Sequence, residues 1–272
     1  MKSIALGQYY PAASVLHRID PRAKVILAFL YIIFSFLCKN ILSFAALIVS
    51  AILLILLSRI PLRTVFQSIK PLFFILLFTV ILNIFWTTGD TLLFEWKFIH
   101  IYYEGIMHAL FMIIRILVLI VGTSMLLTYT TTPIALTDAL EQLLAPLKKI
   151  KVPVHEFAMM MTIALRFIPT LVDETDKIMS AQKARGTDFS NGSLLNRARA
   201  LIPILIPLFV SAFRRAEELA TAMECRCYHG GEGRTRMNVL HYHPRDFVAI
   251  VLMILVGVGL IVLNRLGIGY TM

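Results

Sequence analysis

The chain has 272 residues, of which 58% are hydrophobic and 15% are charged, and its mean hydropathy is +0.80. This composition excludes an ordinary water-soluble domain and favours a protein that crosses a membrane several times. The net charge of +10 does not indicate nucleic-acid binding, because apolar runs interrupt the basic residues and no arginine-rich tract alternates with aromatic residues. The first residues lack the apolar core and cleavage site of a signal peptide, so we expect none to be removed.

A polar segment, residues 1–24, precedes the first apolar run and contains a signal for the start of a helix. Asp20 suits an N-cap, and Pro21 suits the first helical position, where its missing N–H costs nothing. The segment therefore predicts a plain helix start. A segment that docks onto another protein is the alternative.

Five apolar runs predict five transmembrane helices. A span needs about 20 residues, so the shorter runs must include their flanking residues. All but four of the 26 lysines and arginines lie in residues 1–24, 58–70 and 129–246, which places the N-terminus in the cytoplasm and the C-terminus outside. The predicted spans cover residues 25–38, 41–57, 71–86, 106–128 and 247–264.

The connections between these runs carry features of a membrane boundary. Lys39-Asn40 predicts a tight turn between the first two spans. Arg115 lies about ten residues into the fourth span, where a charge needs a partner. We expect it to pair with a helix end or to reach the membrane surface, and a functional site is the alternative. The outer loop near 87–105 carries aromatic residues typical of a membrane interface, namely Trp86, Trp96, Tyr102 and Tyr103.

From Thr132 onward, the sequence changes to long amphipathic helices. One helix begins at Thr132-Pro133, and the next has apolar residues at a 3.6-residue period between Phe157 and Met179. This second helix ends at Ala184-Arg185-Gly186, where glycine suits a left-handed cap. The run 200–213 is short and contains two prolines, so we expect a buried or re-entrant segment there, followed by a helix that ends at Arg226.

The predicted fold class is therefore an all-α polytopic membrane protein, with about five transmembrane helices and a cytoplasmic domain of long amphipathic helices. We expect an N-terminal membrane domain of four spans at residues 1–131. A cytoplasmic coupling-helix domain follows at 132–245, and a C-terminal transmembrane helix at 246–272.

Lone arginines at the ends of the two long helices, Arg185 and Arg226, are the strongest candidates for a functional site. An arginine offers five donors in a planar fork and can clamp a carboxylate at a protein interface. Small neighbours allow such a tip to enter a groove. Two tips of this kind in the most basic cytoplasmic segment favour docking onto partner proteins.

Motifs for catalysis and metal binding are weak. No GxxxxGK[ST] phosphate loop occurs, and His155-Glu156 lacks the second histidine of HExxH, because position 159 is methionine. Cys225 and Cys227, with nearby histidines, have an unusual spacing for zinc. The acidic cluster Asp173–Asp176 leaves open an integral-membrane, Mg-dependent enzyme that binds a diphosphate, although only one such cluster occurs.

Three stretches of the chain resemble the transmembrane (T) component of energy-coupling factor transporters, and the match covers nearly the whole chain. They are the segment from Tyr10-Pro11 to Lys24, the segment from Ala164 to Gly186, and the segment from Arg214 to Arg236. That family has Ala-Arg-Gly at both tips. The first tip matches fully, whereas Arg226 stands between two cysteines.

The resemblance implies a non-catalytic subunit that transmits ATP-driven motion of two cytoplasmic ATPases to a membrane-embedded, substrate-binding S component. The cargo would be a vitamin or another micronutrient, and the site a prokaryotic cell membrane. ATP and Mg would be bound by the ATPases, so neither a cofactor nor a metal is expected in this chain. The tips that would dock the ATPases comprise Ala184, Arg185, Gly186, Cys225, Arg226 and Cys227. The expected S-component surface comprises Phe157, Met160, Met161, Ala164, Leu208, Ala212, Ala216 and Leu219.

Overall fold

The computed structural model describes residues 9–87, 91–96, 99–187, 193–231 and 239–265. These residues form two compact units, which are considered separately. The described residues of the bundle unit lie within 9–139 and 240–265, and those of the long-helix unit lie within 140–239.

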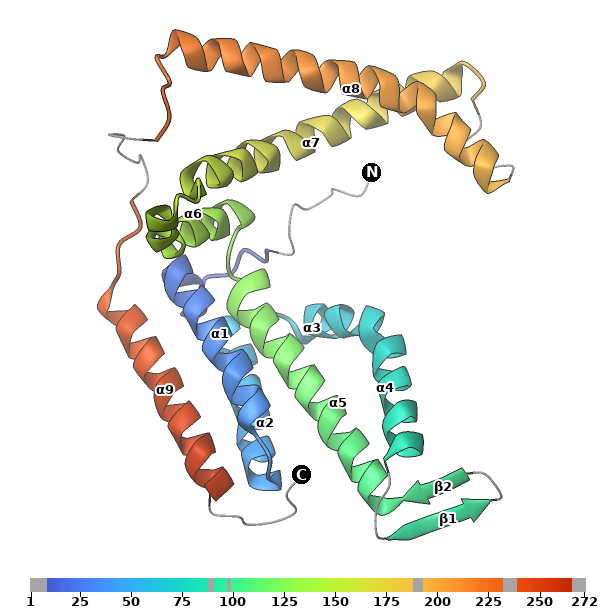
Figure 1. The fold of residues 1–272 in the computed structure, drawn as a ribbon, viewed down its shortest axis with the longest axis vertical. Helices are drawn as coiled ribbons and strands as arrows, with labels where there is room; N and C mark the ends of the chain where they lie inside the picture. Colours follow the sequence, from blue (N-terminus) through green and yellow to red (C-terminus); the bar gives the residue numbers. More distant parts are fainter. Residues whose placement is uncertain (1–8, 88–90, 97–98, 188–192, 232–238, 266–272) are drawn as a thin grey trace. The chain divides into compact units, whose positions relative to one another are not determined.

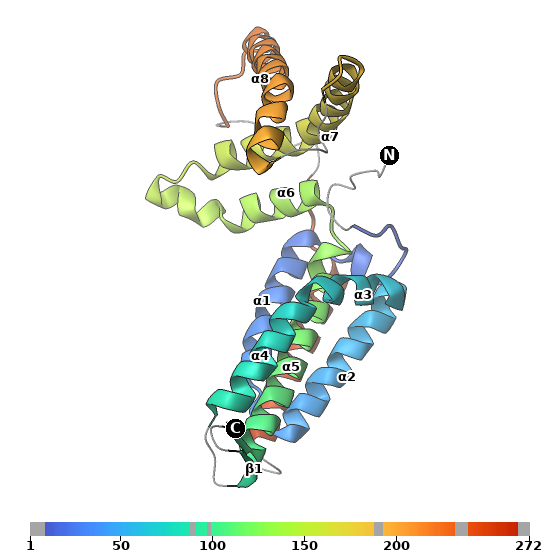
Figure 2. The same cartoon turned by 90° about the vertical axis from the view of Figure 1, so that its right-hand side faces the viewer.

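The described part of the bundle unit is helical apart from one short hairpin, which confirms the predicted all-α class. Helices α1, α2, α5 and α9 pack together, and α4 packs on α5 (Figures 1 and 2). The antiparallel hairpin of β1 and β2 connects α4 to α5. The bounds are α1 Pro21–Leu37, α2 Ile41–Ser58, α3 Leu62–Ile69, α4 Phe73–Trp86, β1 Leu92–Trp96, β2 Ile99–Tyr102, α5 Tyr103–Thr123 and α9 Pro244–Arg265.

Four helical segments in the described part of the chain are long and apolar enough to cross a membrane. They contain four of the five predicted spans. The first predicted span, α1, has 17 residues, so it is about 25 Å long and shorter than the ~30 Å hydrocarbon core. It reaches across a bilayer only together with its flanking residues. The four long segments are Ile41–Ser58, Leu62–Trp86, Tyr103–Thr128 and Pro244–Arg265.

The second of these segments, Leu62–Trp86, is bent, because Pro71 lies in a short 3-10 turn, Lys70–Leu72, between α3 and α4. Figure 1 shows α3 turned away from the direction of α4. The segment 58–70 thus contains a helix that the sequence did not predict. Val65 of α3 is buried, whereas Leu62 and Phe66 are exposed, as in a helix that lies along a membrane surface.

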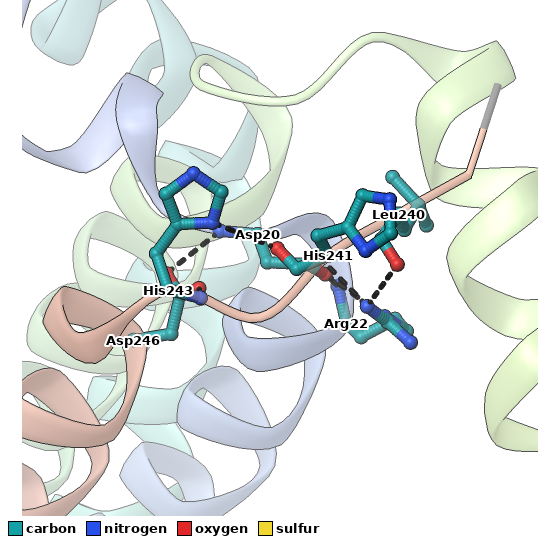
Figure 3. Close-up of polar contacts among 6 residues, drawn as sticks. All are labelled: Asp20, Arg22, Leu240, His241, His243 and Asp246. Atoms are coloured by element: carbon teal, nitrogen blue, oxygen red, sulfur yellow. Dashed lines mark hydrogen bonds and ion pairs between the residues drawn. The ribbon is translucent and has the colours of Figure 1, made fainter.

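A network of hydrogen bonds joins the starts of α1 and α9 (Figure 3). Asp20 caps α1 as predicted, because its carboxylate accepts from the backbone N–H of Arg22. Asp246 is 1% exposed, and its two carboxylate oxygens accept from the N–H groups of Asp20 (3.0 Å) and His243 (2.7 Å). The Arg22 guanidinium binds the Asp20 carboxylate at 3.1 Å and donates to the Leu240 carbonyl at 2.9 Å. Two helices far apart in the sequence therefore begin from one shared polar cluster.

The opposite ends of the same two helices are joined by asparagines. Asn40 caps α2 together with Ser43, and its amide also donates to the last carbonyls of α9, at Leu263 and Asn264. In return, the Asn264 amide donates to the Leu37 carbonyl at 2.6 Å. The predicted turn at Lys39-Asn40 is confirmed, and it also satisfies carbonyl groups that a helix end leaves unpaired.

Arg115 on α5 pairs with a helix end, as expected for a charge within a span. Its guanidinium donates to the Cys38 carbonyl at the end of α1 (2.7 Å) and lies 5.2 Å from the centre of the Phe44 ring. The arginine therefore has a structural partner in the bundle.

Close packing in the bundle depends on a glycine where α5 meets α1. A Cβ atom added at Gly122 would lie 2.1 Å from the Tyr31 ring, and Tyr31 is only 2% exposed. The ring has no solvent-filled space to move into, so α1 and α5 can approach this closely only with glycine at this position.

The long-helix unit contains two helices of more than 30 residues. These are α7, Val154–Ala184, and α8, Leu194–Cys225, and they follow α6, Pro133–Leu143, and a 3-10 turn, Ala145–Ile150. The prediction of a separate buried or re-entrant segment at 200–213 is wrong. Helix α8 is continuous through Pro203 and Pro207, because a proline removes only its own N–H and strains one carbonyl while the neighbouring turns keep their bonds.

We predict that Gly122→Ala destabilises the bundle unit by about 1–3 kcal/mol, because the new methyl group overlaps the buried Tyr31 ring. Thermal unfolding of the purified protein would measure the change. Gly259→Ala is the matched control, since a Cβ there meets nothing within 4 Å. Equal stability of the two variants would contradict this packing.

We also predict that Asp246→Ala lowers the unfolding midpoint by roughly 5 °C. It leaves the buried Asp20 N–H without an acceptor, which costs about 1–3 kcal/mol. Asp246→Asn keeps one amide oxygen and should lose less. An alanine variant as stable as the parent would show that the cluster does not hold α1 to α9.

Candidate functional site: two arginine-tipped helices

Helices α7 and α8 cross as an antiparallel pair (Figure 1). At the crossing, Glu174 of α7 accepts a hydrogen bond from the Ser211 hydroxyl (2.6 Å) and pairs with Arg215 at 3.1 Å, both on α8. The hydrogen bond from Ser211, followed by the charge of Arg215, lowers the pKa of the Glu174 carboxyl. The carboxylate is therefore ionised at neutral pH, and it fixes how the two helices are aligned.

Helix α7 ends in a Schellman motif, with Arg185 as the C-cap residue. The N–H of Gly186 donates to the Lys183 carbonyl at 3.0 Å, and the N–H of Thr187 donates to the Gln182 carbonyl at 3.1 Å. Gly186 has a φ of +89°, which glycine adopts at no steric cost. The alanine-arginine-glycine sequence at this tip thus specifies the last helical residue, the cap and the left-handed residue.

Helix α8 ends in the same motif, with Arg226 as the C-cap residue. The N–H of Cys227 donates to the Glu224 carbonyl at 2.8 Å, and the N–H of Tyr228 donates to the Met223 carbonyl at 3.0 Å. Cys227 takes the left-handed position, with a φ of 54°. The backbone of the second tip therefore reproduces that of the first, although a side chain stands where glycine is strain-free. The cost for an L-residue is about 1–2 kcal/mol.

Both tips present an exposed arginine. Arg185 and Arg226 are exposed, and within the described residues neither side chain makes an ion pair or a hydrogen bond. Their neighbours Ala184, Gly186 and both cysteines are also exposed. Each guanidinium stands at a helix C-terminus, where the partial negative charge of the helix favours a cation.

The tips lie at opposite ends of the helix pair. Tyr228, just after the second tip, donates to the Met159 sulfur near the start of α7 at 2.9 Å, while Arg185 lies 26 residues further along α7. At ~1.5 Å per residue, the tips are separated by about 40 Å. One groove on one partner cannot hold both arginines.

The second tip is anchored to the start of α7. Gly231 is so close to His155 that an added Cβ would lie 2.1 Å from the imidazole, and His155 in turn binds the Glu141 carboxylate at 2.8 Å. Sequence reasoning missed these roles of Met159 and His155, because contacts across 70 residues leave no local pattern. Residues 232–236, which belong to the resemblance, lie outside the described part of the chain.

The residues predicted to face an S component divide into two sets. On α7, Phe157, Met160 and Met161 are 61%, 60% and 41% exposed, and Ala164 is also exposed. On α8, Ala212, Ala216 and Leu219 line an apolar groove of about 240 Å³ that faces Phe167 and Leu171 of α7. Leu208 is half-buried. The structure thus brings the α8 set to the crossing and leaves the α7 set open.

The residues proposed for catalysis or metal binding do not form a site. Asp173 and Asp176 are exposed, and the intervening Glu174 is engaged by α8. In the part of the chain that the structure describes, no three His, Cys, Asp or Glu side chains are placed to share a metal ion.

Comparisons with known proteins agree with the resemblance. A family model described as cobalt transport protein matches residues 12–237. The energy-coupling factor transporter transmembrane protein EcfT of Ruminiclostridium cellulolyticum is 56% identical over 246 residues, which are 90% of this chain and 91% of that protein. The proteins of the same name from Clostridium kluyveri and Bacillus subtilis are 51% and 48% identical, covering 98% and 93% of this chain and 98% and 96% of their own lengths.

We predict opposite effects of two substitutions in the tips. Gly186→Ala should weaken the end of α7 by about 1 kcal/mol, because alanine is strained at positive φ. Cys227→Gly should strengthen the end of α8 by a few tenths to about 1 kcal/mol, because it removes that strain. Hydrogen–deuterium exchange of peptides covering 181–187 and 223–228 would report faster exchange in the first variant and slower exchange in the second. The same direction of change at both tips would contradict a shared left-handed cap.

Proposed function

This chain belongs to the family of energy-coupling factor transporter transmembrane proteins, and on that premise we propose that Arg185 and Arg226 are the points where two ATPase subunits engage it. Membership makes the chain a multi-pass, non-catalytic membrane subunit of an energy-coupling factor transporter. The number of ATPases, the docking residues and the cargo are the proposed part.

One observation carries this proposal. Two long helices end in the same hydrogen-bonded cap, and each cap exposes an arginine without a partner among the described residues. The hydrogen-bonded cap fixes the backbone from which each arginine extends, so little backbone freedom is lost when a partner carboxylate binds the guanidinium. The separation of about 40 Å calls for two docking grooves, hence two ATPase subunits, one for each tip.

The crossing at Glu174 provides the mechanical link between the tips. Ser211 and Arg215 fix α8 against α7, so a displacement of one tip is transmitted through a packed helix to the other. Closure of the ATPases on ATP would draw the tips together and change the angle of the pair. Coupling of this kind requires contacts that differ between two states.

An S component would bind the exposed methionine-rich face of α7 and the groove at the crossing. Methionine is flexible and polarizable, so Met160 and Met161 can repack against a partner that changes its orientation. The cargo, a vitamin or another micronutrient, would be selected by that S component. ATP and Mg would be held by the ATPases.

The bundle unit would anchor this machinery in a prokaryotic cell membrane. The basic residues favour an orientation with the N-terminus and residues 132–245 in the cytoplasm. An integral-membrane enzyme that uses Asp173 and Asp176 gains no support from the structure, because both carboxylates are exposed and Glu174 between them is engaged by α8.

We predict that Arg185→Glu combined with Arg226→Glu abolishes co-purification of the ATPases and ATP-dependent uptake by cells. Removing a buried charge partner at an interface costs roughly 2–5 kcal/mol, which is about 30-fold to several thousand-fold in affinity per tip. Pull-down of the ATPases with the tagged chain measures association directly.

Arg214→Glu is the matched control. Arg214 is an exposed arginine on α8, away from the tip, and pairs only with Glu218 one turn later among the described residues. This charge reversal should leave the complex intact. A double-tip variant that retains its ATPases and its transport would overturn the coupling role.

A further inference from the structure

We infer that the bundle unit carries a binding site for the phosphate of an anionic phospholipid, at the end of α2 beside the N-terminal segment. A pocket of about 340 Å³ lies between residues 13–18 and the last turn of α2. Arg18 and Arg59 line it together with the buried Ser14. The site is separate from the arginine tips and does not depend on the coupling role.

The pocket gathers positive charge that nothing in the described chain neutralises. Its lining residues include two arginines and neither an aspartate nor a glutamate. Within the described residues, the guanidinium groups of Arg18 and Arg59 make no ion pair or hydrogen bond. Two like charges that share one pocket repel each other unless an anion lies between them, and arginine binds phosphate oxygens through two parallel hydrogen bonds.

Arg59 occupies a backbone position that favours glycine. It ends α2 with a φ of 55°, in the left-handed region where glycine is unstrained and arginine is not. Such a local conflict between sequence and backbone is typical of a functional position.

The wall of the pocket that α2 forms fits an acyl chain rather than a free anion. Leu56 and Leu57 lie in the last turn of α2, a helix that is long and apolar enough to span a membrane, and they are 72% and 40% exposed. Arginines directly next to exposed leucines at the end of a span match the boundary between phospholipid headgroups and hydrocarbon. Basic pockets at such boundaries bind anionic headgroups.

The neighbouring helix α3 extends the same surface. Leu62 and Phe66 expose apolar side chains, while Arg63 and Lys70 add positive charge. A helix of this kind lies in the membrane interface. With the cationic side in the cytoplasm, the lipid would belong to the inner leaflet.

Native mass spectrometry of the purified full-length chain tests the site, with phosphatidylglycerol and phosphatidylcholine titrated separately. We expect one phosphatidylglycerol to bind at least tenfold more tightly than phosphatidylcholine. Arg18→Gln combined with Arg59→Gln should remove this preference. Arg166→Gln, an exposed arginine on α7 that does not line the pocket, should keep it.

Two further variants test the role of Arg59 and distinguish a bound phospholipid from free inorganic phosphate. Arg59→Gly removes the guanidinium and relieves the backbone strain, so it should weaken phosphatidylglycerol binding without lowering the unfolding temperature. Leu56→Asn should weaken the binding of phosphatidylglycerol but leave the binding of inorganic phosphate unchanged. A double-arginine variant with the parent's preference, or inorganic phosphate bound as tightly as phosphatidylglycerol, would overturn the lipid site.

Discussion

The hydrogen bonds accepted by the Asp246 carboxylate are the constraint on which the bundle unit depends. One oxygen binds the N–H that precedes α1, and the other binds the N–H that precedes α9, so residues 226 apart in the sequence are held together. Arg22 adds a bond to Leu240, and Lys24, which is 2% exposed, donates to the Thr130 carbonyl at 2.7 Å. Thr130 and Leu240 therefore both lie beside the start of α1.

Hydrogen bonds join α9 to the rest of the bundle at both of its ends. Asp246 makes these hydrogen bonds at the start of α9, and Asn40 and Asn264 make them at its end. In the long-helix unit, the Glu174 carboxylate binds Ser211 and Arg215 and so aligns the two long helices.

The two tips show that a cap geometry can be kept while its sequence changes. Gly186 and Cys227 occupy the same left-handed position and close the same hydrogen bonds. The second tip, which has the strained residue, also contacts the start of α7 through Tyr228 and Gly231.

The sequence by itself determined the helical membrane class, four of the spans, the cap at Asp20 and the two arginine-tipped ends, because apolar runs, helix periods and capping residues are local signals. It also indicated that Arg115 needs a partner, but only the tertiary structure showed that this partner is the Cys38 carbonyl. The continuity of α8 through two prolines was decided by the neighbouring turns, which local propensity does not count. The Asp20–Asp246 link, the contacts of His155 and the pocket between Arg18 and Arg59 join residues far apart in the chain. Such contacts depend on how the helices pack against one another, so no local sequence pattern predicts them.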